Sequence, residues 1–199
     1  LIDVISSEPK IVKYLDIPIQ HCNDKILQLM NRRGNHAYLN ELFRKLRERV
    51  PGIVIRTSLI TGLPGEGEEE FAQLCEFLKQ HKLERVGAFP FSPEEGTPAA
   101  EMEHVDQEIA VQRAELVEQI QSRIMDEYND GMIGTTLEVL VDGYDEETEQ
   151  FFGRTYADSP DIDGRVWIAS QEALSEGSFV MVTIDSTVDG DLCGYLMEE

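Results

Sequence analysis

The sequence predicts a mixed architecture, an α/β segment of a TIM-like βα barrel followed by a small all-β barrel. Strand-like and helix-like runs alternate from residue 9 to about residue 100, one long amphipathic helix follows, and only short β-like runs remain after residue 133. We therefore expect βα units in residues 1–103, a connecting helix in 104–132 and a five-stranded antiparallel barrel in 133–199.

The first part is typical of three βα units. The expected elements are a helix at 1–7, a strand at 11–19, helices at 24–33 and 38–50, a strand at 53–60, a helix at 68–81 and a strand at 84–91. Apolar residues at helical spacing support the helices, and Pro51-Gly52 ends the one before it. Strands separated by helices imply parallel pairing with right-handed crossovers.

Three βα units are too few to close a barrel, so this part is either half of a barrel or a small open sheet. Half a barrel leaves strand edges unpaired, which proteins seldom tolerate. The chain also begins at Leu1, inside a predicted helix. We therefore expect it to be a piece of a longer protein.

After one long helix, the sequence changes from alternating helix-like and strand-like runs to short β-like runs only. Ile109, Leu116, Ile120 and Ile124 form an apolar seam along the helix expected at 105–128. Five short β-runs follow, at 135–141, 150–156, 165–169, 179–187 and 192–197, separated by Asp-Gly and similar turns. Such runs predict a small closed barrel, OB-like or SH3-like.

Charge is concentrated in this last part. Residues 133–199 hold two arginines, Arg154 and Arg165, against 16 acidic side chains, so −14 of the total charge of −22 lies there. Phosphate backbones should be repelled and basic partners attracted, although a merely solvated acidic surface is the alternative. No apolar run approaches the 18 residues of a membrane span, so no membrane partner is expected. Three scattered cysteines favour a reduced, cytoplasmic setting.

The end of the second strand is the main site candidate. There the chain runs through Gly62-Leu63-Pro64-Gly65-Glu66 into an acidic helix start. A strand that stops at a glycine lets a ligand approach bare backbone, and a helix N-terminus carries partial positive charge. In a parallel barrel the ends of neighbouring strands meet at one mouth, so Gln20 and His21 should lie beside Gly62.

Arg56 and Ser58 share one face of the second strand. If that face points into the barrel, Arg56 could pair with a ligand carboxylate. The alternative is a structural ion pair with Asp16 or another carboxylate of the barrel. The dipeptide His21-Cys22 does not favour a metal site, because adjacent residues rarely ligate one ion. His36, His81 and His104 are isolated and are expected to face solvent.

Four segments in order carry a family resemblance: YLDIPIQH at 14–21, MNRRG at 30–34, RTSLITGLPGE at 56–66 and FPFSPEEGTPA at 89–99. Together they resemble the back half of the radical S-adenosylmethionine (SAM) barrel in methylthiotransferases. The segment GRTYADSPDIDG at 153–164 resembles the TRAM domain of the same family. One departure is Gly67, which lacks a helix-capping hydroxyl and should loosen the loop.

Two branches of the family are similar to this chain. The branch that modifies tRNA tends to carry Gln-Ser-Gly where this chain has Gln20-His21-Cys22, and an Asp where Ser58 stands. The branch that modifies a ribosomal protein shows IPIQH, an Arg-Thr-Ser strand and an acidic TRAM unit, as this chain does. The resemblance therefore implies methylthiolation of an aspartate β-carbon on ribosomal protein S-twelve, free or in the ribosomal particle. It disfavours tRNA, which remains the alternative substrate.

The resemblance also implies the cofactors and site residues. The family uses SAM and two [4Fe–4S] clusters, but the cluster motif C-x-x-x-C-x-x-C is missing here, so the ligands should lie outside this chain and the fragment alone should be inactive. The implied SAM pocket is lined by Gln20, His21, Arg56, Ser58 and Gly62. The implied substrate-binding residues of the TRAM unit are Asp142, Glu146, Asp158, Asp161 and Asp163. A third hypothesis is a pure interaction domain whose half-barrel binds no ligand.

Overall fold

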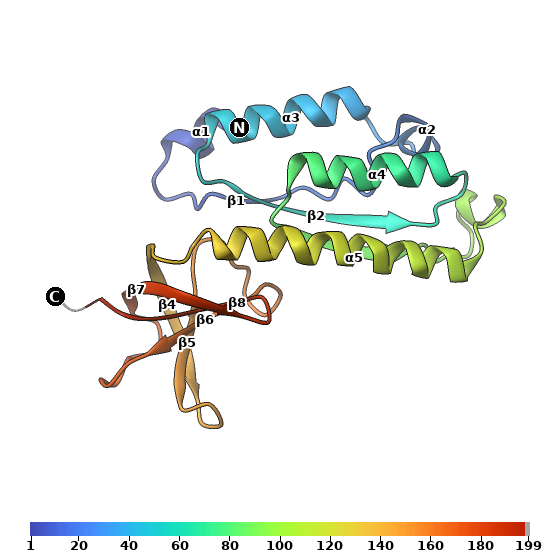
Figure 1. Ribbon diagram of the computed structural model, residues 1–199. Coiled ribbons are helices and arrows are strands. Elements are labelled where there is room, and N and C mark those ends of the chain that lie inside the picture. The colour runs from blue at the N-terminus through green and yellow to red at the C-terminus, as the bar shows by residue number, and fades with distance from the viewer. Residues whose placement is uncertain (198–199) are drawn as a thin grey trace. The chain divides into compact units, whose positions relative to one another are not determined.

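The structure, a computed structural model, describes residues 1–197 and divides into two compact units. The N-terminal unit is Leu1–Ile124 and the C-terminal unit begins at Met125. Figure 1 shows mixed helices and strands in the first unit and β-structure in the second. The predicted fold class, parallel βα units followed by a small β-barrel, is confirmed.

The N-terminal unit holds a three-stranded parallel sheet in the order β1-β2-β3. Its elements are α1 Ile2–Ser7, β1 Tyr14–Asp16, α2 Asp24–Leu29, α3 His36–Arg49, β2 Val54–Thr61, α4 Glu68–His81, β3 Arg85–Pro90, the short 3-10 helix η1 Pro98–Glu101, and α5 Gln107–Asp130, which continues into the second unit. Because the strands are parallel, their carboxyl ends lie at one edge of the sheet.

Helices cover one face of this sheet. Residues of α3 and α4, including Phe43, Leu74 and Phe77, pack in one core with Ile55 and Leu59 of β2. The opposite face of β2, formed by Arg56, Ser58 and Ile60, is only partly buried. Parallel sheets are usually covered on both faces. The partly open face is therefore the one that a barrel would enclose.

Three predicted boundaries change for physical reasons. The strand expected at 11–19 is only Tyr14–Asp16; Ile17 still donates to Arg56 O at 2.9 Å, but Pro18 has no N–H to continue the ladder. The helix expected at 24–33 ends at Leu29, and Asn31 adopts a left-handed φ of 54°. Helix α3 begins two residues earlier than expected because the Asn35 side chain accepts a hydrogen bond from the Tyr38 N–H, at 2.8 Å.

The C-terminal unit is a closed barrel in the order β4-β5-β6-β8-β7. Its strands are β4 Thr136–Asp145, β5 Gln150–Arg154, β6 Val166–Ala169, β7 Phe179–Val188 and β8 Asp191–Leu196. The core consists of Val139, Val141, Val166, Ile168, Val182, Ile184 and Leu192. The expected all-antiparallel pairing is wrong for β6 and β8, which are parallel. Directions cannot alternate around a closed ring of five strands, so at least one neighbouring pair must be parallel.

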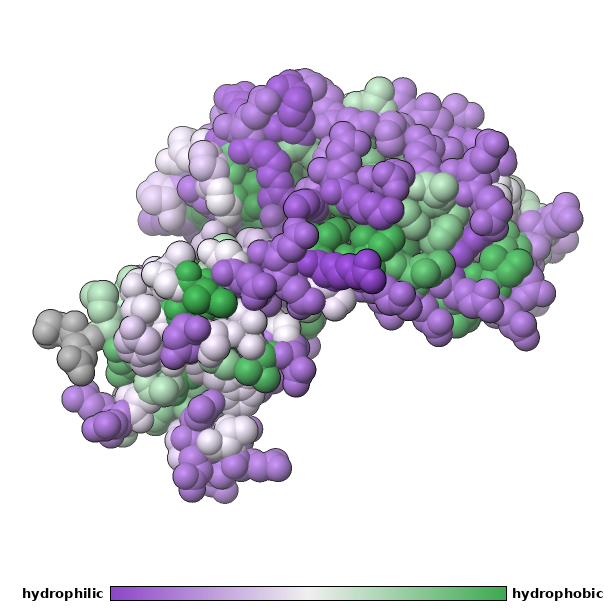
Figure 2. All heavy atoms as spheres, viewed as in Figure 1, coloured by the Kyte–Doolittle hydropathy of each residue, from purple (hydrophilic) through white to green (hydrophobic). Residues whose placement is uncertain are grey.

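Hydrophilic residues cover most of the visible surface, with hydrophobic groups between them on both units (Figure 2). Within residues 1–197, no helix combines the length and the apolar character that crossing a bilayer requires.

Candidate functional site

The carboxyl edge of the parallel sheet brings the ends of β1 and β2 together. Gln20 donates its N–H to Ser58 O at 2.9 Å, and its carbonyl accepts from Ile60 N at 2.8 Å. Its backbone has a left-handed φ of 68°, which turns the chain at the end of the strand. Gln20 and Ser58 are therefore neighbours at this edge, and both are partly exposed.

Arg56 makes the structural ion pair that was the alternative to ligand binding. Its Nη1 lies 3.0 Å from Asp16 Oδ2, and the two residues are register partners across β1 and β2. The Arg56 side chain keeps 23% of its surface exposed. Because a guanidinium has five N–H donors, this ion pair leaves others for a ligand on the open face.

Gly62 turns the chain at the end of β2 with a φ of 73°. A Cβ added at Gly62 would overlap the Cβ of Ala110 on α5. Beside it, the Thr61 hydroxyl donates to Ala110 O at 2.8 Å. Both the backbone angle and the close approach of α5 therefore require glycine here.

A buried carboxylate, Glu66, holds this loop in place. Its Oε1 accepts the Gly62 N–H at 2.9 Å and the Arg113 Nη1–H at 2.9 Å. Arg113, on α5, also donates to Glu66 O at 3.0 Å and to Glu68 Oε1 at 2.6 Å, and it lies 5.2 Å above the centroid of the Phe71 ring. Glu66 is 3% exposed and Arg113 is 5% exposed. Buried charges persist when they are paired and hydrogen-bonded, as here.

His21 points into this network and not to the surface. The residue is fully buried, and its Nδ1 accepts the Asn23 N–H at 3.0 Å. In the neutral ring the proton therefore sits on Nε2, which faces Glu66 Oε2 at 3.4 Å. His21 thus lies beside the glycine loop, as its position after β1 predicted, but it contacts the loop through Glu66.

A cavity of about 460 Å³ opens beside the loop. Its walls include Lys25 of α2, Gly65 and Gly67. Glu70 compensates in part for the missing hydroxyl at Gly67, because its carboxylate accepts the Gly67 N–H at 2.8 Å. A hydrogen bond from Lys25 lowers the pKa of Glu70 to about 2, and the Gly67 N–H contributes. The carboxylate is therefore charged at neutral pH, and the start of α4 is held despite Gly67.

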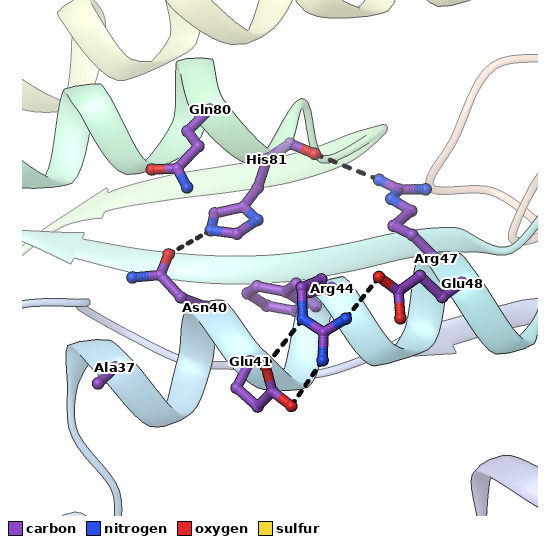
Figure 3. A pocket seen from close by; sticks show the side chains of 9 residues that line it. Ala37, Asn40, Glu41, Arg44, Arg47, Glu48, Gln80 and His81 are labelled. Carbon is purple, nitrogen blue, oxygen red and sulfur yellow. Dashed lines mark hydrogen bonds and ion pairs between the residues drawn. The ribbon is translucent and has the colours of Figure 1, made fainter.

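A second hollow, of about 620 Å³, lies between α3 and α4 (Figure 3). Arg44 is held between Glu41 and Glu48, and His81 Nε2 lies 2.6 Å from Asn40 Oδ1. The hollow contains none of the predicted site residues, and its charged side chains are already paired, Arg44 with Glu41 and Glu48 and Arg47 with Glu84 outside the hollow. It shows no arrangement that points to a ligand.

The expectation that His36 and His81 face solvent is wrong. Both are partly buried, and the His81 ring lies 4.3 Å from the ring of Phe77, centroid to centroid. Burial lowers the pKa of His81 below its ordinary value, and the neighbouring His36 and Arg47 add to this. His36 packs edge-on against Phe77. His104 is exposed, as expected.

The acidic residues proposed in the C-terminal unit divide into two groups. Asp142 pairs with Arg154, Asp158 accepts hydrogen bonds from the Thr155 N–H and hydroxyl, and Asp163 accepts the Ser159 N–H. These three organise the barrel and its loop. Within residues 1–197, the carboxylates of Asp161 and Glu146 have no hydrogen bond or ion pair, and both residues are exposed. Asp142, Asp161 and Asp163 border a cavity of about 550 Å³.

Metal-binding side chains are not clustered in the described part of the chain. Residues 1–197 contain no group of three His, Cys, Asp or Glu side chains that could hold a metal ion. Cys22, Cys75 and Cys193 are all free thiols. The residues present therefore do not fit an iron–sulfur cluster, which needs thiolates in sets.

Two residues of this site, Glu66 and Arg113, were not predicted from the sequence as site residues. Glu66 could have been noticed as a carboxylate that directly follows the Pro-Gly turn. Arg113 carries no such signal, because it lies 47 residues further on and only the packing of α5 brings it to the loop.

Known families match both units. The model of the radical SAM superfamily matches residues 1–78, and that of the TRAM domain matches residues 133–197. A solved structure, coproporphyrinogen III oxidase HemN from Escherichia coli, is 18% identical with a TM-score of 0.48 over 56% of this chain and 27% of that chain, too remote to carry an argument.

Curated relatives match the chain from end to end. The ribosomal protein uS12 methylthiotransferase RimO of Pelobacter propionicus is 45% identical over 100% of this chain and 44% of its own length. Proteins of the same name from Myxococcus xanthus and Anaeromyxobacter sp. are 48% and 45% identical, over 100% and 99% of this chain and 42% of their own lengths. The chain thus spans less than half the length of the relatives that it matches.

Proposed function

The chain belongs to the radical SAM methylthiotransferase family, with relatives named RimO, and we propose that its parent protein adds a methylthio group to an aspartate β-carbon of ribosomal protein uS12 (S-twelve). The observation that carries the proposal is the identity of 45–48% to enzymes of that name over the whole of this chain. The loop 62–66, in which Glu66 accepts the Gly62 N–H, also supports the proposal. It lies at the carboxyl edge of the parallel sheet, where ligand sites of βα barrels are built.

In this proposal the chain contributes one wall of the SAM pocket. Gln20, Arg56 and Ser58 offer polar groups on the open side of the sheet, and Gly62 offers bare backbone. His21 was expected among these contacts, and its burial against Glu66 favours a positioning role. SAM and the iron–sulfur clusters supply the radical chemistry and the sulfur transfer of the family. In this proposal the residues of this chain bind and orient, and within residues 1–197 no group of side chains could ligate a cluster.

The C-terminal unit would recruit the substrate. The net charge of −14 in its residues 133–199 suits a basic ribosomal protein, in solution or on the ribosomal particle, better than tRNA. Asp161 and Glu146 have carboxylates that are free to meet basic side chains. Asp142, Asp158 and Asp163 would contribute mainly by shaping the loop that carries Asp161. We also propose a cytoplasmic location, because ribosomes are found there. Three free thiols are consistent with such a reducing compartment.

The test uses the full-length parent protein with its clusters reconstituted under anaerobic conditions. Purified uS12 and unmodified tRNA are offered in parallel with SAM and a reductant, and the products are analysed by mass spectrometry. The proposal predicts a mass gain of one methylthio group on uS12 and none on tRNA. Methylthiolated tRNA with unchanged uS12 would contradict the proposal and favour the other branch of the family.

A further inference from the structure

Four large apolar side chains stand on the outer surface of the C-terminal barrel. Phe179 is 66% exposed, Met181 42%, Tyr195 49% and Met197 53%. Figure 2 shows hydrophobic groups on the surface of this unit. We call these four residues the β7–β8 patch. Exposed apolar side chains are common one by one, but a contiguous group marks an interaction site more often.

The register of the strands makes the patch contiguous. Met197 N–H donates to Met181 O at 3.0 Å, and Tyr195 is the register partner of Thr183, which follows Met181 on the same face of β7. Phe179 precedes Met181 by two residues, so it also lies on this face. Side chains opposite and diagonal to one another across two strands touch or nearly touch. The four side chains therefore form one surface.

The core of the barrel does not include these four side chains. Val182 and Ile184, which alternate with the patch along β7, are buried and belong to the barrel core. Residues that face outward on a small barrel are normally polar, because strands alternate apolar-in and polar-out. Apolar side chains at these outward positions therefore point to a surface that is covered when a partner binds.

Charge identifies the kind of partner. Glu138 is the register partner of Met181 on the neighbouring strand β4, so an acidic side chain borders the patch. The two arginines of residues 133–199 lie on other strands or loops, and both are engaged: Arg154 with Asp142, and Arg165 over the rings of Phe152 and Trp167. Nucleic acid would be repelled here, because its phosphates would meet acidic charge with no free cation.

A second copy of this chain is also disfavoured as the partner. Each copy carries a net charge of −22, so two copies would repel each other. A basic polypeptide with apolar side chains between its basic ones fits both the apolar patch and its acidic surroundings. Its positive charge is attracted to the acidic side chains, and its apolar groups cover the patch. We propose that the β7–β8 patch is the docking surface for such a segment of the ribosomal protein substrate. This inference rests on the proposed function and assigns to it a surface of apolar residues, distinct from the acidic loops.

The methionines fit this use. Met181 and Met197 are flexible and polarisable, so they adapt to the shape of an extended segment. Phe179 and Tyr195 supply large, rigid contact areas of the kind that dominates binding energy. The acidic surroundings would accelerate encounter, and the apolar contacts would set the lifetime of the complex.

The test compares binding of purified uS12 to the 199-residue chain and to two double variants. Phe179→Ser with Met181→Ser removes half of the patch. Ile133→Ser with Val188→Ser is the matched control, because it removes two aliphatic side chains that are 46% and 54% exposed and lie in the turn before β4 and at the far end of β7. Far-UV circular dichroism and Trp167 fluorescence check that each variant keeps its fold.

The patch variant should weaken uS12 binding about 10-fold or more, through a faster off-rate, and the control should change it less than about 2-fold. Equal affinities of the patch variant and the unmodified chain would overturn this inference and leave the proposed function intact. Tight tRNA binding that is lost in the patch variant, or loss of self-association without any effect on uS12, would also overturn it. Absence of uS12 binding by the unmodified chain would contradict the proposed function as well.

Discussion

Arg113 Nη1 lies 2.9 Å from Glu66 Oε1, and both side chains are almost completely buried. The same carboxylate oxygen accepts the N–H of Gly62. A residue of α5 thereby fixes the backbone of the loop that we assign to the SAM pocket. Removing one partner of a buried ion pair leaves the other charge uncompensated, which costs far more than losing a surface pair.

Arg113→Met should therefore lower the free energy of unfolding by about 3 kcal/mol. Urea unfolding followed by circular dichroism at 222 nm measures this, since the helices lie largely in the N-terminal unit. Arg44→Met is the matched control: Arg44 pairs with Glu41 and Glu48 on the exposed side of α3, so the loss should stay below about 1 kcal/mol. Equal effects of the two substitutions would show that the buried pair has no special role.

Gly62→Ala should destabilise the protein more than the same change at Gly96. Both glycines have a positive φ, 73° and 80°, so both pay the cost of a left-handed alanine, about 1 kcal/mol. Only at Gly62 would the new Cβ overlap Ala110; at Gly96 it meets nothing within 4 Å. The expected excess at Gly62 is about 2 kcal/mol, measured by urea unfolding. A difference near zero would mean that α5 can move away from the loop without cost.

His81 should make stability depend on pH below 6.5. Its pKa in the folded state is lowered, mainly by burial and also by His36 and Arg47, so the neutral form is favoured by folding. This contribution is fully present above the unfolded pKa of about 6.5 and is lost as the pH falls through the folded value. An NMR titration should give a midpoint below 6.5 for His81, and His81→Phe should reduce the loss of stability between pH 6.5 and 5. A midpoint at or above 6.5 would contradict the burial argument.

Arg56→Ala should weaken SAM binding to the reconstituted parent protein about 10-fold, because a donor on the open face of the sheet is lost. Asp16→Asn is the control, since it removes the ion pair but keeps the guanidinium. Isothermal titration at constant cluster content compares the two variants. If both leave the affinity unchanged, Arg56 serves only the ion pair and is removed from the pocket.

Some of these features could be predicted from local sequence, and others could not. The turn at Gly62 follows from glycine and Pro-Gly after an apolar strand, and the element order follows from apolar periodicity. The direction of His21 could not be predicted, because Pro18 and the left-handed Gln20 interrupt the alternation of the strand. The Glu66–Arg113 pair depends on tertiary packing across 47 residues, which no local pattern encodes.

The β7–β8 patch could not be predicted from the sequence for a different reason. The sequence Phe179-Val180-Met181-Val182 is apolar at every position, so its period does not reveal which side chains face the core. Register with β4 and β8 decides this in the structure. The acidic loops, by contrast, were conspicuous in the sequence, although three of their carboxylates organise the barrel.

The most direct test of the central claim is disruption of the gene for the parent protein, followed by mass spectrometry of uS12 and of tRNA from the same cells. The account predicts that the methylthio group disappears from uS12, that tRNA methylthiolation is unchanged, and that the intact gene restores the modification. Unchanged uS12 with loss of the methylthio group from tRNA would contradict the assignment of this chain to the protein-modifying branch.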